Sequence, residues 1–345
     1  MEISKLDKNF KVETKIKKDD VAFYSVLEAP FSVHGVAYLD GKFRRMDEDV
    51  ARSVSPGVYG LHANTAGGRV RFKTDSPYVA IYAKMENVGK MPHFALSGSA
   101  GFDLYIGKNY FRTFIPPYEM TNGYESHHDI GEKKMREITI NFPLYSDVCE
   151  LYIGLSESAR VLPPREYKIK KPIVFYGSSI TQGGCASRPG ASYEAIVSRA
   201  LDAEYINLGF SGNARAEDEM ISYISHLDMS AFVYDYDHNA PTYEHLALTH
   251  EKMFTAIREA HPNLPILIMP RPKYNLNEDE KKRLEIIKTT YQNALNKGDK
   301  NVYFIDGKAL LGEIRDEGTV DNCHPTDLGF YYMAKAVTKV LKKVL

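Results

Sequence analysis

The two halves of the chain differ in the pattern of their hydrophobic and polar positions. In the first half, short runs rich in Val, Ile, Tyr and Phe are separated by Gly, Pro, Asp and Asn. This rhythm is typical of antiparallel strands in a β-sandwich, and few windows carry a helical period. The predicted strands are Val21–Leu27, Phe31–Leu39, Val70–Lys73, Tyr78–Lys84, Glu137–Phe142 and Leu151–Leu155.

The second half alternates between strand-like and helix-like segments. The predicted strands are Pro172–Tyr176, Tyr205–Leu208, Ala231–Tyr236, Leu264–Met269 and Val302–Ile305. The predicted helices are Tyr193–Leu201, Tyr243–Ala260, Glu278–Leu295 and Asp327–Leu345, and in the last of these the apolar residues recur on one face. Strands buried on both sides and alternating with helices imply a parallel sheet covered by helices.

Between the halves, the stretch VLPPREYKIKK (Val161–Lys171) is rich in Pro and Lys and has no hydrophobic pattern. Such a stretch is typical of a linker, and a length of 345 residues accommodates two domains. We therefore predict a β-sandwich domain over residues 1–165 and an α/β domain over residues 166–345.

Composition narrows the class of protein. Lys and Arg total 44 against 45 for Asp and Glu, which argues against a dedicated nucleic-acid binder. No run approaches the roughly 20 apolar residues of a membrane helix, and the polar start lacks a secretory signal. The expected location is cytoplasmic for the sequence as given, or periplasmic or secreted if a signal was removed. Cys149, Cys185 and Cys323 have no metal-type spacing and are expected to be free thiols.

Candidate chemistry follows the strands of the second half, where an open α/β sheet gathers its ligands. Four segments fit this rule: Gly177–Thr181, Gly209–Asn213, Asp235–Asn239 and Asp321–Pro325. Ser179, between a strand and a helix, could use backbone N–H groups to stabilise an oxyanion. Taken alone, Gly-Ser-Ser is more typical of a capped turn, and the G-x-S-x-G pattern of common α/β-hydrolases is absent.

Asp321 and His324 would supply the base that a serine nucleophile requires. Their three-residue spacing can put a carboxylate against the imidazole, although an ordinary helix start would show the same residues. Gly212 and Asn239 would complete an oxyanion hole, or could be turn residues. His238 is a rival base, but His324 is preferred because its position fits the whole set of segments.

In this order, the segments resemble the sequence blocks of the SGNH (GDSL) hydrolase superfamily. GSSIT stands where that family has G-D-S-L, with Ser179 matching the nucleophile and Ser178 replacing the aspartate. LGFSGN resembles the second block, whose glycine falls at Gly212, and DNCHPTDLG resembles the last, with Asp321 and His324 matching.

The third block and the first half of the chain extend the resemblance. DYDHNAP resembles G-x-N-D, with Asn239 matching while Asp237 and Ala240 replace the glycine and the aspartate. GFDLY, at Gly101–Tyr105, resembles the GxDLY motif of the β-rich domain that precedes the catalytic domain in one subgroup.

The resemblance implies a three-layer α/β/α domain of the flavodoxin-like type, preceded by a jelly-roll-like β-sandwich. It implies a serine esterase in which Ser179 attacks an ester carbonyl, His324 transfers the proton and Asp321 orients His324. The backbone N–H of Ser179, Gly212 and Asn239 would bind the oxyanion. This chemistry needs no metal or organic cofactor.

The substrate is inferred from the loops between the blocks. They are polar, charged and rich in Tyr, and include Arg188, Arg215, Glu217, Asp218 and Arg271. We therefore expect a short acyl group, such as acetyl, on a carbohydrate or a similar polar alcohol. Acyl transfer to a small-molecule acceptor is an alternative. Another is a glycan-binding protein with a vestigial hydrolase domain, which the intact set of matching residues disfavours.

Overall fold

The computed structural model describes residues 14–345, which form two compact units. The first unit contains the described residues up to Arg45, together with Ala63–Glu166 and Ser187–Gly190. The second unit contains Met46–His62, Tyr167–Ala186 and Ala191–Leu345. The expected domain boundary after residue 165 stays a prediction. The compact units differ from it in three places, because residues 46–62 belong to the second unit and residues 166 and 187–190 belong to the first.

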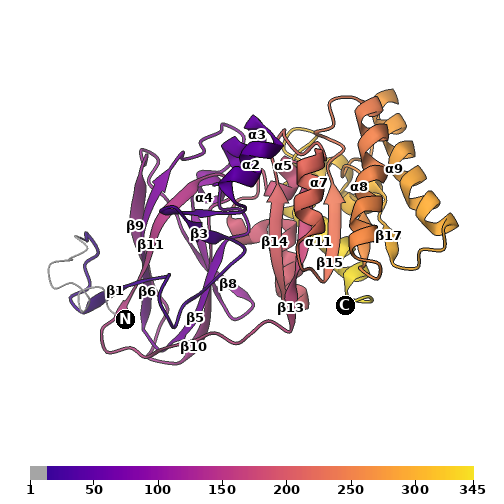
Figure 1. Ribbon diagram of the computed structural model, residues 1–345. Coiled ribbons are helices and arrows are strands. Elements are labelled where there is room, and N and C mark those ends of the chain that lie inside the picture. Colours follow the sequence, from indigo (N-terminus) through magenta and orange to yellow (C-terminus); the bar gives the residue numbers. More distant parts are fainter. Residues whose placement is uncertain (1–13) are drawn as a thin grey trace. The chain divides into compact units, whose positions relative to one another are not determined.

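The first unit contains two antiparallel sheets (Figure 1). One sheet has, in spatial order, β1 (Val21–Ser25), β11 (Asp147–Ser156), β6 (Tyr78–Glu86) and β9 (Gly123–Asp129). The other has β12 (Val161–Leu162), β5 (Arg69–Thr74), β10 (Arg136–Asn141), β7 (Phe102–Ile106) and β8 (Asn109–Phe114), and β2 (Ser32–His34) also pairs with β5. The unit further includes the hairpin β3 (Ala37–Leu39) and β4 (Lys42–Arg44) and the helix α4 (Leu96–Ser99).

The two sheets of the first unit enclose a single apolar core. On β6, Ile81 and Met85 point into this core, and on β10 of the other sheet Ile138 and Ile140 do the same. Every second residue of a strand faces one side, so the alternate residues of β6, such as Lys84, lie on the outer face. The predicted β-sandwich is therefore confirmed.

The second unit contains a five-stranded sheet in which all neighbouring strands are parallel. In spatial order the strands are β14 (Ala203–Gly209), β13 (Ile169–Gly177), β15 (Ala231–Asp235), β16 (Ile266–Ile268) and β17 (Val302–Phe304). In chain order this is 2-1-3-4-5, the flavodoxin-like arrangement, whose order reverses at β13. The carboxyl ends of β13 and β15 therefore flank the position where such sheets bind ligands.

Helices cover both faces of this sheet. The helices of this unit are α2 (Glu48–Val54), α3 (Pro56–Leu61), α5 (Ser179–Gln182), α6 (Tyr193–Leu201), α7 (Asp218–Ser225), α8 (Tyr243–Ala260), α9 (Glu278–Asn296), α10 (Gly307–Leu311) and α11 (Asp327–Leu341), with the 3₁₀-helix η2 (Gly312–Gly318). A second 3₁₀-helix, η1 (Pro189–Ala191), lies where the chain passes from the first unit to the second. On one face, Tyr176 and Tyr234 share a core with residues of α7, α8 and α9. On the other, Phe175 contacts Tyr193 of α6, which stacks on Phe330 of α11. The three-layer α/β/α prediction is confirmed.

Helices α2 and α3 belong to the second unit although they interrupt the strands of the first. Ala51, Val54 and Val58 of these helices are buried in the core of the α/β unit. None of the helices in the described part of the chain combines the length and apolar composition that crossing a membrane requires.

Candidate active site

Ser179 is the first residue of α5, directly after β13. Ser178 caps this helix, because its hydroxyl accepts a hydrogen bond from the N–H of Ile180 at 3.2 Å. Ser178 is fully buried, whereas Ser179 retains 9% of its surface. The turn that Gly-Ser-Ser predicts is therefore present, and Ser178 rather than Ser179 provides the cap. The hydroxyl of Ser179 is left for another partner.

Two glycines let α5 lie close against the ends of the strands. Gly177 pairs with Gly209 on one side and Asp235 on the other. A Cβ at Gly177 would lie 1.8 Å from Oδ1 of Asp235, and a Cβ at Gly209 would lie 2.1 Å from the backbone nitrogen of Gln182. Thr181 of α5 donates a hydrogen bond to Asp235 in the space left by the missing side chain. The position of the helix is thus fixed by backbone contact.

Ser179, His324 and Asp321 form a continuous chain of hydrogen bonds. The hydroxyl of Ser179 lies 2.8 Å from Nε2 of His324, and Nδ1 of His324 lies 2.8 Å from Oδ2 of Asp321. With the proton of the neutral imidazole on Nδ1, His324 donates to Asp321 and accepts from Ser179. This arrangement is the one a serine nucleophile requires, because the base is adjacent and its tautomer is fixed by a carboxylate.

The turn that carries Asp321 and His324 is held by hydrogen bonds between its backbone and the side chain of Asp321. Oδ1 of Asp321 accepts the N–H groups of Cys323 at 3.1 Å and of His324 at 2.8 Å. Asn322 between them adopts a φ of 63°, a left-handed conformation that Asn tolerates. Partial burial by itself would raise the pKa of Asp321, but the hydrogen bonds from His324 outweigh it and hold the pKa below its usual value. Asp321 is therefore ionised at neutral pH, so its carboxylate can accept the hydrogen bond from Nδ1 of His324.

Gly212 lies on a loop that a hydrogen bond connects to α5, and Asn239 lies on a second loop that is bonded to the first. The N–H of Ser211 donates to the side chain of Gln182 at 2.9 Å, and Asn239 accepts the N–H of Ala214 through Oδ1 at 3.2 Å. This bond leaves the NH₂ group of the Asn239 amide available as a donor. Gly212 is exposed with a φ of 71°, a backbone conformation that favours glycine. Because the neighbouring N–H groups of Ser211, Asn213 and Ala214 are bonded within the protein, the N–H of Gly212 is the one this loop could offer to an oxyanion.

His238, the rival base, has a different environment. Its Nδ1 lies 3.8 Å from Sγ of Cys323, and its Nε2 has no hydrogen-bond partner within residues 14–345. Burial lowers the pKa of His238 to about 4, so the ring is neutral at physiological pH. The residue whose imidazole contacts the Ser179 hydroxyl is His324.

The loop of Asn239 is held by two arginines that the sequence reasoning did not place there. Asp237, which replaces the family's glycine, accepts a hydrogen bond from Nε of Arg271 at 2.9 Å. Arg283 of α9 donates to the backbone oxygens of Asp237 and Ala240, each at 2.9 Å. At position 237, the aspartate that replaces the family's glycine is thus anchored by Arg271. Arg271, which the sequence analysis named among the charged loop residues, bonds to Asp237 and to Glu280.

The GxDLY motif has a direct structural role within the first unit. Gly101 is required because a Cβ there would lie 2.3 Å from the backbone oxygen of Ser97. Asp103 is fully buried and accepts the N–H of Gly190 at 2.9 Å and the amide of Asn141 at 2.8 Å. The hydroxyl of Tyr105 donates to the backbone oxygen of Gly190 at 3.2 Å.

Arg188 completes this arrangement around the segment Ser187–Gly190. Its guanidinium lies over the ring of Tyr110 and donates to the hydroxyl of Tyr105 at 2.8 Å and to Asp103 at 3.5 Å. Along the chain, this segment follows α5 after only four residues, Gly183–Ala186. The GxDLY motif therefore holds segment Ser187–Gly190 against the β-sandwich. This segment follows α5, the helix that carries Ser179.

The three cysteines are free, as their spacing predicts. Burial raises the pKa of Cys185 to about 12 and that of Cys323 to about 11, which disfavours the reactive thiolate. Asp321, Cys323 and His324 place possible metal-ligand atoms within 4.8 Å of one another, but Asp321 and His324 are hydrogen-bonded to each other. The expectation that no cofactor is needed stays a prediction.

Comparison with known proteins agrees with the fold and assigns the family. Residues 170–342 match the GDSL-like lipase/acylhydrolase family, and residues 21–161 match the GxDLY domain found at the N-terminus of SGNH-hydrolase-type esterases. The chain therefore belongs to the SGNH (GDSL-like) acylhydrolases and is an acylhydrolase enzyme. No match was found among curated protein sequences.

Solved structures extend the likeness over nearly the whole chain. A GDSL-like lipase from Bacteroides ovatus is 30% identical with a TM-score of 0.83, over 94% of this chain and 98% of that one. The salicylyl-acyltransferase SsfX3 of a tetracycline biosynthetic pathway is 20% identical with a TM-score of 0.78, over 95% and 99%. An acetyl xylan esterase from Butyrivibrio proteoclasticus is 13% identical with a TM-score of 0.60, over 94% and 98%. The latter two likenesses concern the fold.

Proposed function

We propose that the protein is a serine esterase that removes a short acyl group, with acetyl the leading case, from a hydroxyl of a carbohydrate. The observation that carries the proposal is the hydrogen-bond chain from Ser179 through His324 to Asp321, with 2.8 Å at each step. The proposal assigns Ser179 as nucleophile, His324 as general base and acid, and Asp321 as the residue that orients His324.

In the first half of the reaction, Oγ of Ser179 attacks the acyl carbon while its proton passes to Nε2 of His324. The carbonyl oxygen becomes an oxyanion, which the backbone N–H of Ser179, that of Gly212 and the amide of Asn239 stabilise. Collapse of this intermediate breaks the ester bond, and His324 protonates the departing sugar hydroxyl. The acyl group stays on Ser179.

In the second half, His324 removes a proton from water, whose oxygen attacks the acyl-enzyme. The second tetrahedral intermediate expels Oγ of Ser179, which regains its proton from His324, and the free acid leaves. Asp321 stabilises the imidazolium in both halves without taking its proton. Its lowered pKa supports this role, because a carboxylate that stays ionised retains its attraction for the imidazolium.

Two observations support a small acyl group and a polar alcohol. The loops between the catalytic segments are polar and charged, whereas an acyl chain of a lipid would need an extended apolar surface. The chain also shares its fold with a protein described as an acetyl xylan esterase. Both arguments concern the class of substrate and leave the particular sugar open.

The test compares p-nitrophenyl acetate with a long-chain p-nitrophenyl ester and measures acetate released from acetylated polysaccharides and oligosaccharides. We expect faster turnover of the acetyl ester, and loss of activity in Ser179→Ala. The matched control is Ser198→Ala, because Ser198 is a buried serine of the same unit whose hydroxyl donates to the backbone of Ala203. A preference for the long-chain ester would contradict the carbohydrate proposal, and full activity in Ser179→Ala would contradict the nucleophile.

Acyl transfer to a small-molecule acceptor is the second candidate, supported by the shared fold with a salicylyl-acyltransferase. The two reactions use the same acyl-enzyme and differ in whether water or an alcohol resolves it. Product analysis in the presence of a graded series of alcohols separates them. Ester products that exceed the free acid at low alcohol concentration would favour transfer, and free acid throughout would favour hydrolysis.

A further inference from the structure

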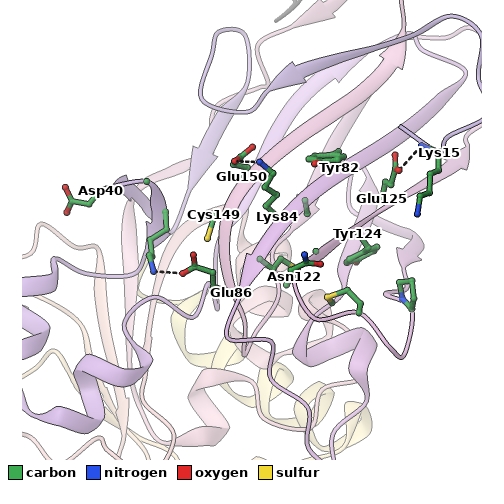
Figure 2. A pocket seen from close by; sticks show the side chains of 17 residues that line it. Lys15, Asp40, Tyr82, Lys84, Glu86, Asn122, Tyr124, Glu125, Cys149 and Glu150 are labelled. Carbon is green, nitrogen blue, oxygen red and sulfur yellow. Dashed lines mark hydrogen bonds and ion pairs between the residues drawn. The ribbon is translucent and has the colours of Figure 1, made fainter. Parts of the chain in front are cut away.

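The first unit contains a polar groove of about 840 Å³ on the outer face of its four-stranded sheet (Figure 2). Tyr82, Lys84 and Glu86 of β6 point into it, because alternate residues of a strand share a face. β9 contributes Glu125 and β11 contributes Glu150. The outer face of an antiparallel sheet is ordinarily covered by water, so a hollow with walls on this face calls for an explanation.

The groove is built from interactions that join its walls to its floor. Lys42, at the end of the β3–β4 hairpin, pairs with Glu86 of β6 at 2.9 Å. On the opposite side, Glu125 accepts the N–H of Lys15 at 2.8 Å and the hydroxyl of Thr14. These bonds hold the walls in place without a ligand, which lowers the entropy lost on binding.

The charges of the groove are already matched. Glu150 pairs with Lys84 at 2.7 Å across neighbouring strands, and Asp40 lies 3.9 Å from Arg44. Together with the Lys42–Glu86 pair, these contacts leave Lys15 and Glu125, one charge of each sign, as the other charged residues of the lining. The groove therefore has no cluster of cations suited to a phosphate and no cluster of carboxylates suited to a cation. Hydrogen bonding to the partner carboxylates raises the pKa values of Lys42 and Lys84, so both lysines stay charged at neutral pH.

Groups that can recognise a neutral ligand remain. In the described part of the chain, neither the hydroxyl of Tyr82 nor the side-chain amide of Asn122 has a hydrogen-bond partner. The ring of Tyr82 is half-buried and is supported by Phe23 and Tyr152, with ring centroids 6.4 Å and 6.0 Å away. A rigid tyrosine offers a flat apolar face together with a polar tip, at little cost in conformational entropy.

From these observations we propose that the groove is a binding site for a neutral oligosaccharide, with a sugar ring stacked on Tyr82 and sugar hydroxyls bonded to Asn122 and to the outer oxygens of the paired carboxylates. A sugar combines an apolar C–H face with hydroxyl groups that both donate and accept. A sugar therefore matches a lining that offers the aromatic ring of Tyr82, the amide of Asn122 and carboxylates already paired with lysines. The site lies in a different unit from Ser179 and does not depend on the function assigned to Ser179.

The test uses the full chain with Ser179→Ala, so that turnover does not remove the ligand. Affinity electrophoresis is run in gels that contain soluble arabinoxylan, glucomannan or mixed-linkage β-glucan, with polygalacturonate as an anionic comparison. We expect at least one neutral polysaccharide to retard the protein, and Tyr82→Ala to weaken that affinity about tenfold. Asn122→Ala removes an exposed loop amide and should weaken binding without affecting the fold, and Tyr331→Ala, an exposed tyrosine of α11, is the matched control.

Three results would overturn the proposal. The first is that none of the neutral polysaccharides retards the protein. The second is that Tyr82→Ala and Asn122→Ala are retarded as strongly as their parent. The third is that polygalacturonate binds more tightly than every neutral polymer. With Ser179 intact, the groove variants should hydrolyse p-nitrophenyl acetate at the unaltered rate. Because binding and hydrolysis are read separately, failure of one proposal does not count against the other.

Discussion

Asp103 of the GxDLY motif provides a sharp test of how the β-sandwich stabilises the segment after α5, the helix that carries Ser179. Both oxygens of this fully buried carboxylate are engaged, one by the N–H of Gly190 and the other by the amide of Asn141. Asp103→Asn keeps the shape but replaces one acceptor with an NH₂ group that faces another donor. A hydrogen bond to a charged group is worth about 1.5–3 kcal/mol, and a buried donor left without an acceptor costs about 1–3 kcal/mol more, so the substitution should destabilise the protein by about 3–5 kcal/mol.

Local measurements distinguish a specific role of Asp103 in holding residues 187–190 from a general contribution to the stability of the protein. In Asp103→Asn, backbone hydrogen exchange of residues 187–190 should rise well before that of the sandwich core, and the rate at which Ser179 is acylated by p-nitrophenyl acetate should fall. Asp75→Asn is the matched control, since Asp75 is a buried carboxylate of the same unit that accepts two bonds from Arg160. Equal exchange of residues 187–190 in the two variants, compared at equal overall stability, would refute the reasoning.

Three further predictions concern the second unit. Asp321→Asn should keep the fold and lower kcat roughly 10³- to 10⁴-fold, because the imidazole loses its orienting carboxylate; a loss below tenfold would contradict that role. Burial lowers the pKa of His250 to about 3, against about 6.5 in the unfolded chain, so stability should be full above pH 6.5 and fall by about 2 kcal/mol by pH 5. His250→Gln, followed by urea denaturation from pH 7 to 5, should remove this part of the slope, and unchanged slopes would exclude it. Gly177→Ala should prevent folding or displace α5, since its Cβ would lie 1.8 Å from Asp235, and wild-type stability and activity would contradict this.

Much of the α/β unit could be predicted from the sequence because its elements carry strong local signals. The helix predicted over Tyr243–Ala260 has those bounds in the structure, as does the one over Tyr193–Leu201. Both are amphipathic and end near residues that stop a helix. The rule that parallel strands present ligands at their carboxyl ends also selected the segments of Ser179 and His324, whose side chains the structure places in contact.

The elements missed in the first half have weak local signals. β9 reads GYESHHD and lies at the edge of its sheet, so it shows little of the apolar alternation that identifies a buried strand. α2 has only seven residues, although Asp47 before it and two acidic residues in its first turn are ordinary helix-start signals. That α2 packs into the second unit is a long-range property, which no local pattern carries.

Some contacts around the candidate site could not be predicted from local sequence patterns. Arg283 lies more than forty residues after Asp237 along the chain, and only the folded structure brings its guanidinium to the loop of Asn239. The same holds for Asp103 and Gly190, which the sequence separates by 87 residues. The motif could be recognised from the sequence, but its physical purpose follows from the contact.

The central claim is that Ser179 carries the acyl group during turnover, and trapping the acyl-enzyme tests it most directly. The protein is mixed with p-nitrophenyl acetate, quenched in acid within the first turnover, digested and analysed by mass spectrometry. The account predicts one acetyl group on the peptide that contains Ser179, and none on that peptide in Ser179→Ala. Acetylation of a different residue at the rate of the burst, or a burst that persists in Ser179→Ala, would contradict it.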